Sequence, residues 1–553
     1  MIVHAFELFW YSPQLEFLSV FNVMMSPCVP MSWRRDADPA ELAALVPDAT
    51  PASAPGVTSL VPVAQALAAS HLGTLDVPDV AVESSLRRLL VALFIRITGL
   101  TCDDPDEWED SWDSLLAAGR LDPAAVSAYV DKWAARFNLH DPVRPFLQDS
   151  RLADECGEPA SPGKLVMTRP SGNNQPWMNH IPQSAPVTPH EAFWWVLAWR
   201  NYGPSGLGAN RSHNGITHKS MAAAPLRATI SWHPDTGSEY ANLLLSCPTP
   251  TTIPVTGPDL PEWEQDSLPD PLHPQLPTGP VSRLINRASH AVLTIVDPAS
   301  GQITGCRIAW RTPVPSAIKN TGAKAALETT LEAITGADDP FLINRDTKGP
   351  VRANHTRSLL RDFDSLIHIR RAGDTAKSGV TPPAWIRFLD TLPTDALDQL
   401  GTVRARALAC HQDKQEKDEL WFAQTTPVGV AAYTSGRHPE QAARVATTCG
   451  NAESSAQALG QALRRAWRGI SPDPRSECPW THTAIAAYWD QADALFWAGI
   501  EPGSAGADFT RLAVRIYDDA TRTDASTPTG MLPIAHSRRI LTQPPAIRRK
   551  KSK

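Results

Sequence analysis

The chain has 553 residues with 51 basic and 58 acidic side chains, a formal charge of −7, and unusually many prolines (51) and tryptophans (18). The length indicates roughly two to four domains, and 42% hydrophobic with 20% charged residues is typical of a globular protein. Because tryptophans need cores and prolines interrupt helices and strands, the composition excludes a wholly disordered chain and favours a folded one with many long loops.

The N-terminal part begins with residues 1–20, which are either an extension of the reading frame or an ordinary pair of strands. Ser84–Gly99 has apolar residues at helical spacing and a glycine at its end, which predicts a helix with a wide apolar face. A second amphipathic helix is expected over Pro123–Phe137.

The middle of the chain alternates long loops with short elements. Residues 156–187 carry six spaced prolines and predict a loop, and an aromatic helix is expected over Pro189–Asn201. A glycine-rich loop, 202–211, follows this helix. Strands are expected over Leu226–Trp232 and Ser282–Val296, with a hairpin joining Ala291–Asp297 to Gly305–Arg311, which together predict a mixed α/β domain.

From His438 onward long helical patterns replace the strands. Apolar residues recur at three and four over 438–469, 480–500 and 507–522, with short connections, which predicts an antiparallel bundle. The expected fold is therefore α+β: a large mixed α/β N-terminal domain plus a C-terminal antiparallel four-helix bundle. The predicted domains are 1–20 (extension), 21–428 (mixed α/β), 429–525 (bundle) and 526–553 (disordered basic tail).

The spacing of the cysteines and the length of the apolar segments indicate the cellular compartment of the protein. The eight cysteines form no CxxC pair, so no zinc knuckle is expected, and dispersed thiols are typical of reduced proteins. Residues 1–25 contain no Lys or Arg and lack a signal-peptide pattern, and Leu89–Leu100 is too short to span a bilayer. We expect a cytoplasmic protein without a membrane partner.

Enzyme signatures are mostly missing. The chain has no GxxxxGK[ST], HExxH or GxSxG motif. The dipeptide His140-Asp141 leaves a metal-dependent hydrolase of the HD type open as an alternative, although the further His and Asp ligands that it needs are not evident. The acidic run Asp106–Asp110 places its carboxylates on one helix, whereas glycoside chemistry needs two carboxylates facing each other. We predict no catalytic residue, no cofactor and no metal.

Two segments point to nucleic acid. Three glycines after a helix, Gly203, Gly206 and Gly208, allow a close approach to another backbone, as in a DNA minor groove, or form only a helix cap and a turn. Residues 345–377 carry eight basic against four acidic side chains, which favours phosphate contacts as much as a solvated face with ordinary ion pairs. The basic side chains that we assign to this phosphate patch are Arg352, Arg357, Arg361, Arg370 and Arg371.

An ordered set of segments resembles the large, CasA-type subunit of the type I-E CRISPR surveillance complex, Cascade. They extend over about 500 residues and include the helix at 86–99 and the glycine segment. The other segments are Phe21–Pro30, Trp133–Gln148, Asn174–Asn179, Pro261–Trp263, Asp418–Phe422 and the terminal bundle. Residues 1–20 then lie outside the family.

The resemblance implies recognition rather than catalysis. Such subunits read the PAM beside the target, largely from the minor groove of double-stranded DNA, begin duplex unwinding and recruit a separate helicase-nuclease in antiviral defence, while a guide RNA supplies the remaining specificity. The implied partners are target DNA, guide RNA, the other Cascade subunits and the helicase-nuclease. A purely structural scaffold subunit is the other alternative.

The family's functional positions carry over residue by residue. The PAM loop falls on Gly203, Ser205, Gly206, Gly208, Asn210 and Arg211. The loop that contacts guide and neighbouring subunits falls on Gln175, Trp177 and Asn179. The minor-groove lysine is Lys319 or Lys324, and the wedge beneath the PAM is His411, Gln412 or Lys414. An Asn-Gln pair and a cysteine cluster found in some members are absent from this sequence.

Overall fold

A long buried helix, α3 (Val80–Thr98), forms the centre of the body in the computed structural model. The Asp79 side chain accepts from the backbone of Ala81 and Val82 at its start, and Gly99 adopts φ +77° at its end, so a cap and a left-handed glycine define the helix. This confirms the helix predicted over 84–99 and extends it by one turn. The structure describes residues 21–47, 58–169, 182, 184–336, 338–345, 349–353, 359–369, 379–412, 418–473 and 475–542.

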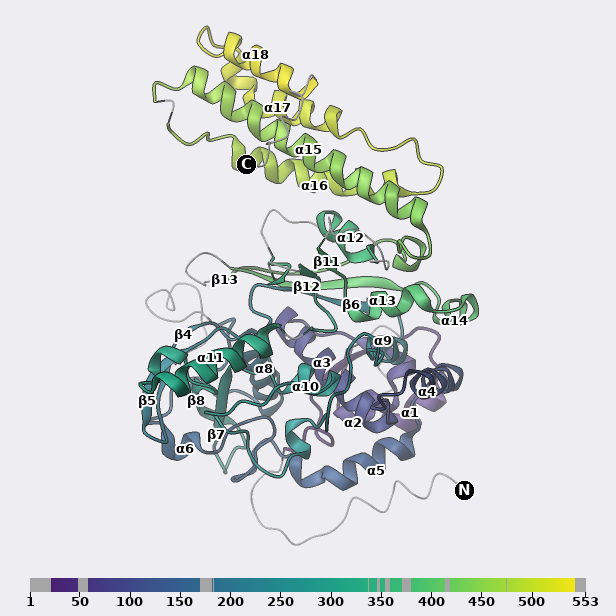
Figure 1. Cartoon of the computed structure of the whole chain (residues 1–553), viewed down its shortest axis with the longest axis vertical. Helices are drawn as coiled ribbons and strands as arrows, with labels where there is room; N and C mark the ends of the chain where they lie inside the picture. The colour runs from purple at the N-terminus through teal and green to yellow at the C-terminus, as the bar shows by residue number, and fades with distance from the viewer. Residues whose placement is uncertain are drawn as a thin grey trace.

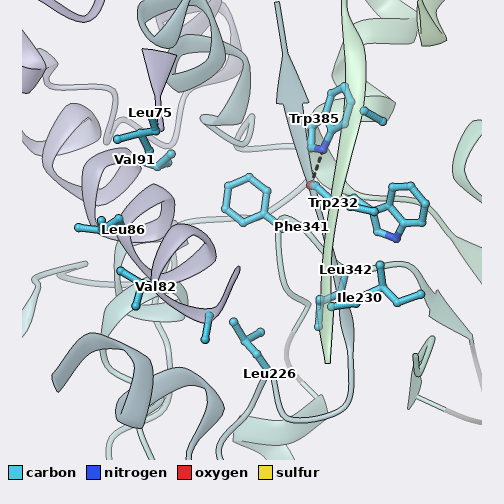
Figure 2. Packing of buried hydrophobic residues seen from close by; sticks show 14 of the residues in the cluster. Leu75, Val82, Leu86, Val91, Leu226, Ile230, Trp232, Phe341, Leu342 and Trp385 are labelled. Carbon is cyan, nitrogen blue, oxygen red and sulfur yellow. Dashed lines mark hydrogen bonds between the residues drawn. The ribbon is translucent and has the colours of Figure 1, made fainter. Parts of the chain in front are cut away.

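A three-stranded antiparallel sheet packs on α3. Its order is β13 (Asp418–Thr425), β12 (Arg404–Gln412) and β6 (Ile230–Asp235). Figure 2 shows Phe341 between α3 and this sheet, and the indole Nε1 of Trp385 donates to the Trp232 carbonyl at 2.9 Å. The core thus lies between one helix and strands that are far away in the sequence.

Smaller sheets and helices surround this core (Figure 1). The other strands are β1 (Val29–Trp33), β2 (Thr58–Val61), β3 (Gly73–Leu75), β4 (Gly206–His213), β5 (Ile216–Met221), β7 (His290–Val296), β8 (Ile303–Trp310), β9 (Asn344–Arg345), β10 (Gly349–Pro350) and β11 (Val380–Thr381). The other body helices are α1 (Pro39–Leu45), α2 (Val63–Ala68), α4 (Pro105–Ala118), α5 (Pro123–Trp133), α6 (Leu152–Glu155), α8 (Pro189–Tyr202), α9 (Glu239–Ser246), α10 (Pro280–Ile285), α11 (Thr321–Gly336), α12 (Leu360–Ile367), α13 (Ala384–Thr391) and α14 (Thr394–Leu400).

The body agrees with the predicted mixed α/β architecture, with local differences. The helix expected over 189–201 and the β7–β8 hairpin are confirmed. The strand expected over 282–296 is instead a short helix, α10, followed by β7. The Asp259 carboxylate accepts from the backbone of Val281 and Ser282, and this contact with a distant residue starts α10.

The C-terminal part is a four-helix bundle, drawn at the top of Figure 1, and its helices are joined by short connections. They are α15 (Pro439–Ile470), α16 (Thr481–Ile500), α17 (Phe509–Ala525) and α18 (Met531–Thr542). The fourth helix corrects the tail predicted over 526–553. Its buried Ile534 and Leu541 pack inward, and the guanidinium of Arg538 donates to Asp518 of α17 at 2.7 Å, so part of the basic run belongs to the bundle. Residues 543–553 lie outside the described residues.

The helix α12 joins the body to the bundle. It packs against α15, and its Phe363 ring meets the rings of Phe496 and Trp497. Bundle contacts therefore begin before the boundary predicted at 428. No helix in the described part of the chain is long and apolar enough to cross a membrane.

Candidate nucleic-acid interface

The three glycines after α8 occupy three different environments. A Cβ on Gly203 would lie 2.7 Å from the His290 ring, and a Cβ on Gly208 would lie 2.6 Å from the Ile308 carbonyl oxygen. Gly206 has φ +135°, and a Cβ there would meet nothing within 4 Å. Two glycines are therefore required by packing inside the protein, while Gly206 combines a backbone conformation that favours glycine with open space outside it.

The glycine segment is a strand rather than the predicted loop. Residues from Gly206 onward form β4, which pairs with β5 and has an irregular register between Leu207 and Arg211. Leu207 is 60% exposed and Asn210 is exposed, whereas Ser205 is half-buried. The irregular part of β4 thus exposes Gly206, Leu207 and Asn210, and we call this segment the glycine edge (residues 205–210).

Arg211 does not belong to that exposed edge, which corrects its assignment to DNA contact. Its side chain is fully buried, with Nη2 at 2.9 Å from Asp149 Oδ2 and Nε at 2.6 Å from Glu155 Oε2. Its Nη1 donates to the Trp310 carbonyl at 2.8 Å. Burial alone would raise the pKa of Asp149, but the hydrogen bond from Arg151 and the charge of Arg211 hold it below its usual value. Arg211 therefore anchors the hairpin to the body.

The strand β13 contacts the end of α8, just before the glycine edge. Figure 1 shows β13 and β4 on the same side of the body. The Trp421 ring of β13 meets the ring of Tyr202, the last residue of α8, with centroids 5.4 Å apart. The buried Arg227 donates to the Tyr202 carbonyl at 2.8 Å and pairs with Asp418 of β13. These contacts bring together segments about 200 residues apart in the sequence.

Of the wedge candidates, His411 and the backbone of Gln412 lie at the end of β12. His411 is half-buried and pairs with Leu420, and the strand register shifts between His411 and Gln412. The backbone of Gln412 belongs to β12, while its side chain and Lys414 lie outside the described part.

The two lysine candidates follow a turn that packs on the β4–β5 hairpin. The 3-10 turn Pro315–Ala317 contacts β5, and the exposed Lys319 lies two residues after it. Lys324 lies on α11, where its Nζ is 3.8 Å from Glu328 Oε1. Lys319 is thus the more exposed of the two, whereas Lys324 lies near a carboxylate of its own helix.

The predicted phosphate patch is only partly described. Arg352 is exposed. Arg361 pairs with Glu453 of α15 at 2.5 Å, and its guanidinium lies 4.5 Å from the centre of the Trp489 ring. It therefore joins α12 to the bundle, which corrects its assignment as a phosphate contact. Arg357, Arg370 and Arg371 lie outside the described residues, as do Gln175, Trp177 and Asn179 of the predicted guide-contact loop.

The His140-Asp141 dipeptide forms a turn. Asp141 Oδ1 accepts from the backbone of Val143 and Arg144 at 2.8 and 2.6 Å, and burial lowers the pKa of His140 to about 4. Among the described residues no group of three or more His, Cys, Asp or Glu side chains could hold a metal ion. The dipeptide therefore has no metal-ligand set around it within that part of the chain.

Tyr202, Arg227 and Trp421 were not predicted as site residues. Trp421 lies in Asp418–Phe422, one of the segments that resemble the family, so this resemblance could have indicated it as a site residue. Arg227 and Tyr202 carry no local signal, because their role depends on a strand that begins about 190 residues later.

The chain is similar to a known protein family and to several solved structures. Residues 51–522 match the family model of the CRISPR-associated protein Cse1. A solved structure described as a CRISPR RNA-guided surveillance complex is similar, with 28% identity and a TM-score of 0.78 over 95% of this chain and 99% of that chain. A second, described as the pre-nicking surveillance complex, has 27% identity and a TM-score of 0.69 over 95% and 99%.

More distant likenesses concern the fold alone. Cse1 from Acidimicrobium ferrooxidans has 18% identity and a TM-score of 0.68 over 96% of this chain and 98% of that chain. No curated protein sequence gives a significant match.

Proposed function

The chain belongs to the CRISPR-associated Cse1 family, and from this membership we propose that it is the PAM-reading large subunit of a type I-E RNA-guided surveillance complex. In this proposal the subunit contacts double-stranded target DNA, starts its unwinding and recruits a helicase-nuclease in trans. It performs no catalysis itself and acts in the cytoplasm, where the guide RNA and the other Cascade subunits hold the remaining DNA.

The observation that carries the proposal is the contact between β13 and the end of α8, which directly precedes the glycine edge. Tyr202 and Arg227 connect the two through the ring contact with Trp421 and the ion pair with Asp418. A reader of duplex DNA needs a narrow element for the minor groove and a second element at the adjacent base step. In this proposal the glycine edge serves as the first element and the end of the β12–β13 hairpin as the second.

The reading step follows from the shape of the glycine edge. Gly206 has open space where a side chain would be, and the exposed Asn210 supplies amide donors and acceptors. The minor groove displays base acceptors and, at G·C pairs, one donor, so backbone and amide groups can discriminate there. The exposed Lys319 would add a positive charge near the groove.

The unwinding step would use the end of the β12–β13 hairpin. His411, Gln412 or Lys414 inserts at the first base step and replaces base stacking, which costs a few kcal/mol and is offset by guide pairing. Arg352, Arg357, Arg370 and Arg371 remain the proposed phosphate contacts. Gln175, Trp177 and Asn179 remain the proposed contact with guide RNA and neighbouring subunits.

The test is a substitution at Gly206 in the assembled complex. A pool of duplexes with randomised nucleotides beside a guide-matched target is captured and sequenced, and the enrichment over the pool defines PAM-dependent binding. Gly206→Asp places a carboxylate against the negative groove, so we expect enrichment to fall at least tenfold while subunit assembly is unchanged.

Two control variants separate charge from backbone strain. Gly401 also has positive φ and open space but ends α14 away from the site, so Gly401→Asp should retain the enrichment. Gly206→Ala adds the strain without the charge and should have an intermediate effect. If Gly206→Asp and Gly401→Asp bind the pool alike, the subunit is a structural scaffold at this edge.

The hydrolase alternative has its own readout. The HD-type reading requires metal-dependent turnover of a nucleotide substrate that His140→Ala removes. We expect no such turnover from the purified chain with Mg²⁺ or Mn²⁺. Turnover that depends on His140 would contradict the proposed non-catalytic role.

A further inference from the structure

A second concentration of positive charge lies at the junction of α10, α13 and the residues after α11. Arg283 lies on α10, Arg287 follows that helix and Arg387 lies on α13. The backbone N–H of Ala384 donates to the Pro340 carbonyl at 2.9 Å, which places the start of α13 beside the acidic pair Asp338-Asp339.

One of the two acidic residues already has a complete partner. The Asp339 carboxylate is buried and receives both Nη atoms of Arg88 from α3, at 2.9 and 2.8 Å. It also accepts the backbone N–H of Phe341 at 3.0 Å. Little of its hydrogen-bonding capacity remains for a further arginine.

The three outer arginines are half-buried, and several of their N–H groups are buried without a hydrogen-bond partner among the described residues. The Arg287 side chain is 9% exposed, and its Nη1 is 3.5 Å from Asp339 Oδ2 without forming a hydrogen bond. Its Nε, together with Nε and Nη1 of Arg283 and Nε of Arg387, has no hydrogen-bond partner among the described residues. A buried donor left without a partner costs about 1–3 kcal/mol, and more when it is charged.

The electrostatics agree with this geometry. Burial lowers the pKa of each of the three guanidiniums, and the opposing pull of Asp338 acts on all three. Asp339 also pulls on Arg283 and Arg287, while Arg88 and Arg283 repel Arg287. Asp259 attracts Arg283 but is bonded to the start of α10. Because arginine stays protonated in proteins, this region keeps an excess of positive charge.

We propose that Arg283, Arg287 and Arg387 form a binding site for a phosphate group. The donors come from three backbone positions around the Asp338-Asp339 pair, and donors from several side chains suit the several oxygens of a tetrahedral oxyanion. A carboxylate, with two oxygens in one plane, is satisfied by a single arginine fork, as Arg88 satisfies Asp339. The site lies on elements separate from the glycine edge, so it does not depend on the proposed PAM reading.

The test measures phosphate binding by the full chain. Inorganic phosphate is titrated calorimetrically at constant ionic strength, with acetate as the planar comparison. We expect phosphate to bind and acetate to bind at least tenfold more weakly. Arg283→Gln and Arg387→Gln should each weaken phosphate binding at least tenfold.

A matched control uses an arginine of the same body. Arg404 is partly exposed and lies 3.5 Å from Asp235, and Arg404→Gln should change phosphate affinity less than twofold. Equal phosphate affinity in the wild type, Arg283→Gln, Arg387→Gln and Arg404→Gln would overturn the site, as would equal binding of acetate and phosphate. Far-ultraviolet circular dichroism of each variant confirms that it is folded.

Competition distinguishes the two sources of phosphate. Adenosine 5′-monophosphate supplies a phosphate monoester, and a short duplex without a guide match supplies backbone phosphodiesters. If the duplex displaces inorganic phosphate and Arg387→Gln lowers the salt dependence of duplex binding by about one phosphate contact, the natural ligand is a nucleic-acid backbone. If only the mononucleotide displaces inorganic phosphate, the ligand is a small phosphorylated molecule. Both results support the site, whereas displacement by neither overturns it.

Discussion

Arg211 and Arg287 are both buried arginines, yet their surroundings differ in kind. Arg211 has hydrogen bonds at Nε, Nη1 and Nη2, to two carboxylates and a carbonyl. Arg287 has one ion pair at 3.5 Å with a carboxylate that Arg88 already occupies. The sequence presents both as basic residues. The comparison teaches that a buried arginine with complete partners holds the fold together, whereas one with incomplete partners is free to serve a ligand.

The largest effect that would sharpen this comparison is expected at Arg211. Arg211→Met removes three charge-assisted hydrogen bonds in a buried place, those to Asp149, Glu155 and the Trp310 carbonyl. Asp149 keeps Arg151 and Glu155 keeps His213, so the loss comes from these three bonds, and we expect the free energy of unfolding to fall by about 3–5 kcal/mol. Urea unfolding of the full chain measures it. If Arg211→Met had normal stability but no longer bound DNA, Arg211 would belong to the DNA interface.

A third buried basic residue, His290, is held in its neutral form, and this predicts that the stability of the protein depends on pH. Burial lowers the pKa of His290 to about 4, against an ordinary value of 6.5, despite the hydrogen bond to the Pro204 carbonyl. The unfolded chain therefore takes up this proton first. Stability from neutral His290 is complete above pH 6.5 and is lost as pH falls toward about 4.

The variant His290→Gln removes that titration and keeps a side-chain donor for Pro204. Between pH 6.5 and 4 its stability should decline less steeply than that of the wild type, by up to about 3 kcal/mol over the whole window. Other buried histidines, such as His140, titrate in both proteins and cancel in the difference. Parallel pH–stability curves would contradict a neutral buried His290.

Local signals predicted only some of the helices, namely α3, α5, α8, α15, α16 and α17. Their apolar spacing lies within each segment, so the sequence alone indicated a mixed α/β body followed by a helical bundle. Helices such as α11 and α13 were not predicted. The helix α18 was missed because Arg538 and Arg539 were grouped with the basic residues 548–553 into one tail, although apolar residues of the same helix pack on α15 and α17. Its stability comes from those neighbours rather than from its own composition.

The site was predicted less completely, because its residues depend on distant partners. Glycine content indicated the segment after α8, but Gly203 and Gly208 are explained by packing against His290 and Ile308. Arg211 and Arg361 were assigned to nucleic acid, yet each is occupied by carboxylates from elements far away in the sequence. No local pattern distinguishes an arginine that meets a carboxylate inside the protein from one that meets a phosphate outside it.

The direct counterpart to the first prediction is Arg287→Met. Because Asp339 keeps both bonds from Arg88, removing Arg287 leaves no carboxylate without a partner and relieves an incompletely compensated buried charge. We expect the free energy of unfolding in phosphate-free buffer to change by less than about 1 kcal/mol, in either direction. A loss as large as that expected for Arg211→Met would show that Arg287 is a fully engaged structural arginine and remove the contrast.

The smallest effect on stability is expected at Lys319, where the lysine is exposed and no buried partner is lost. Lys319→Gln should leave the free energy of unfolding within about 0.5 kcal/mol of the wild type, whereas the slope of log affinity against log salt for PAM-containing duplexes should become shallower by about 0.9. Lys324, which already lies 3.8 Å from Glu328, is the matched control, and Lys324→Gln should change the slope less. The exposed Lys319 is therefore expected to affect the salt dependence of DNA binding, whereas Lys324, five positions later, already has a partner and is expected to affect it less. If Lys324→Gln changes the slope more than Lys319→Gln, the lysine that follows the Pro315–Ala317 turn is not the one that reaches the DNA.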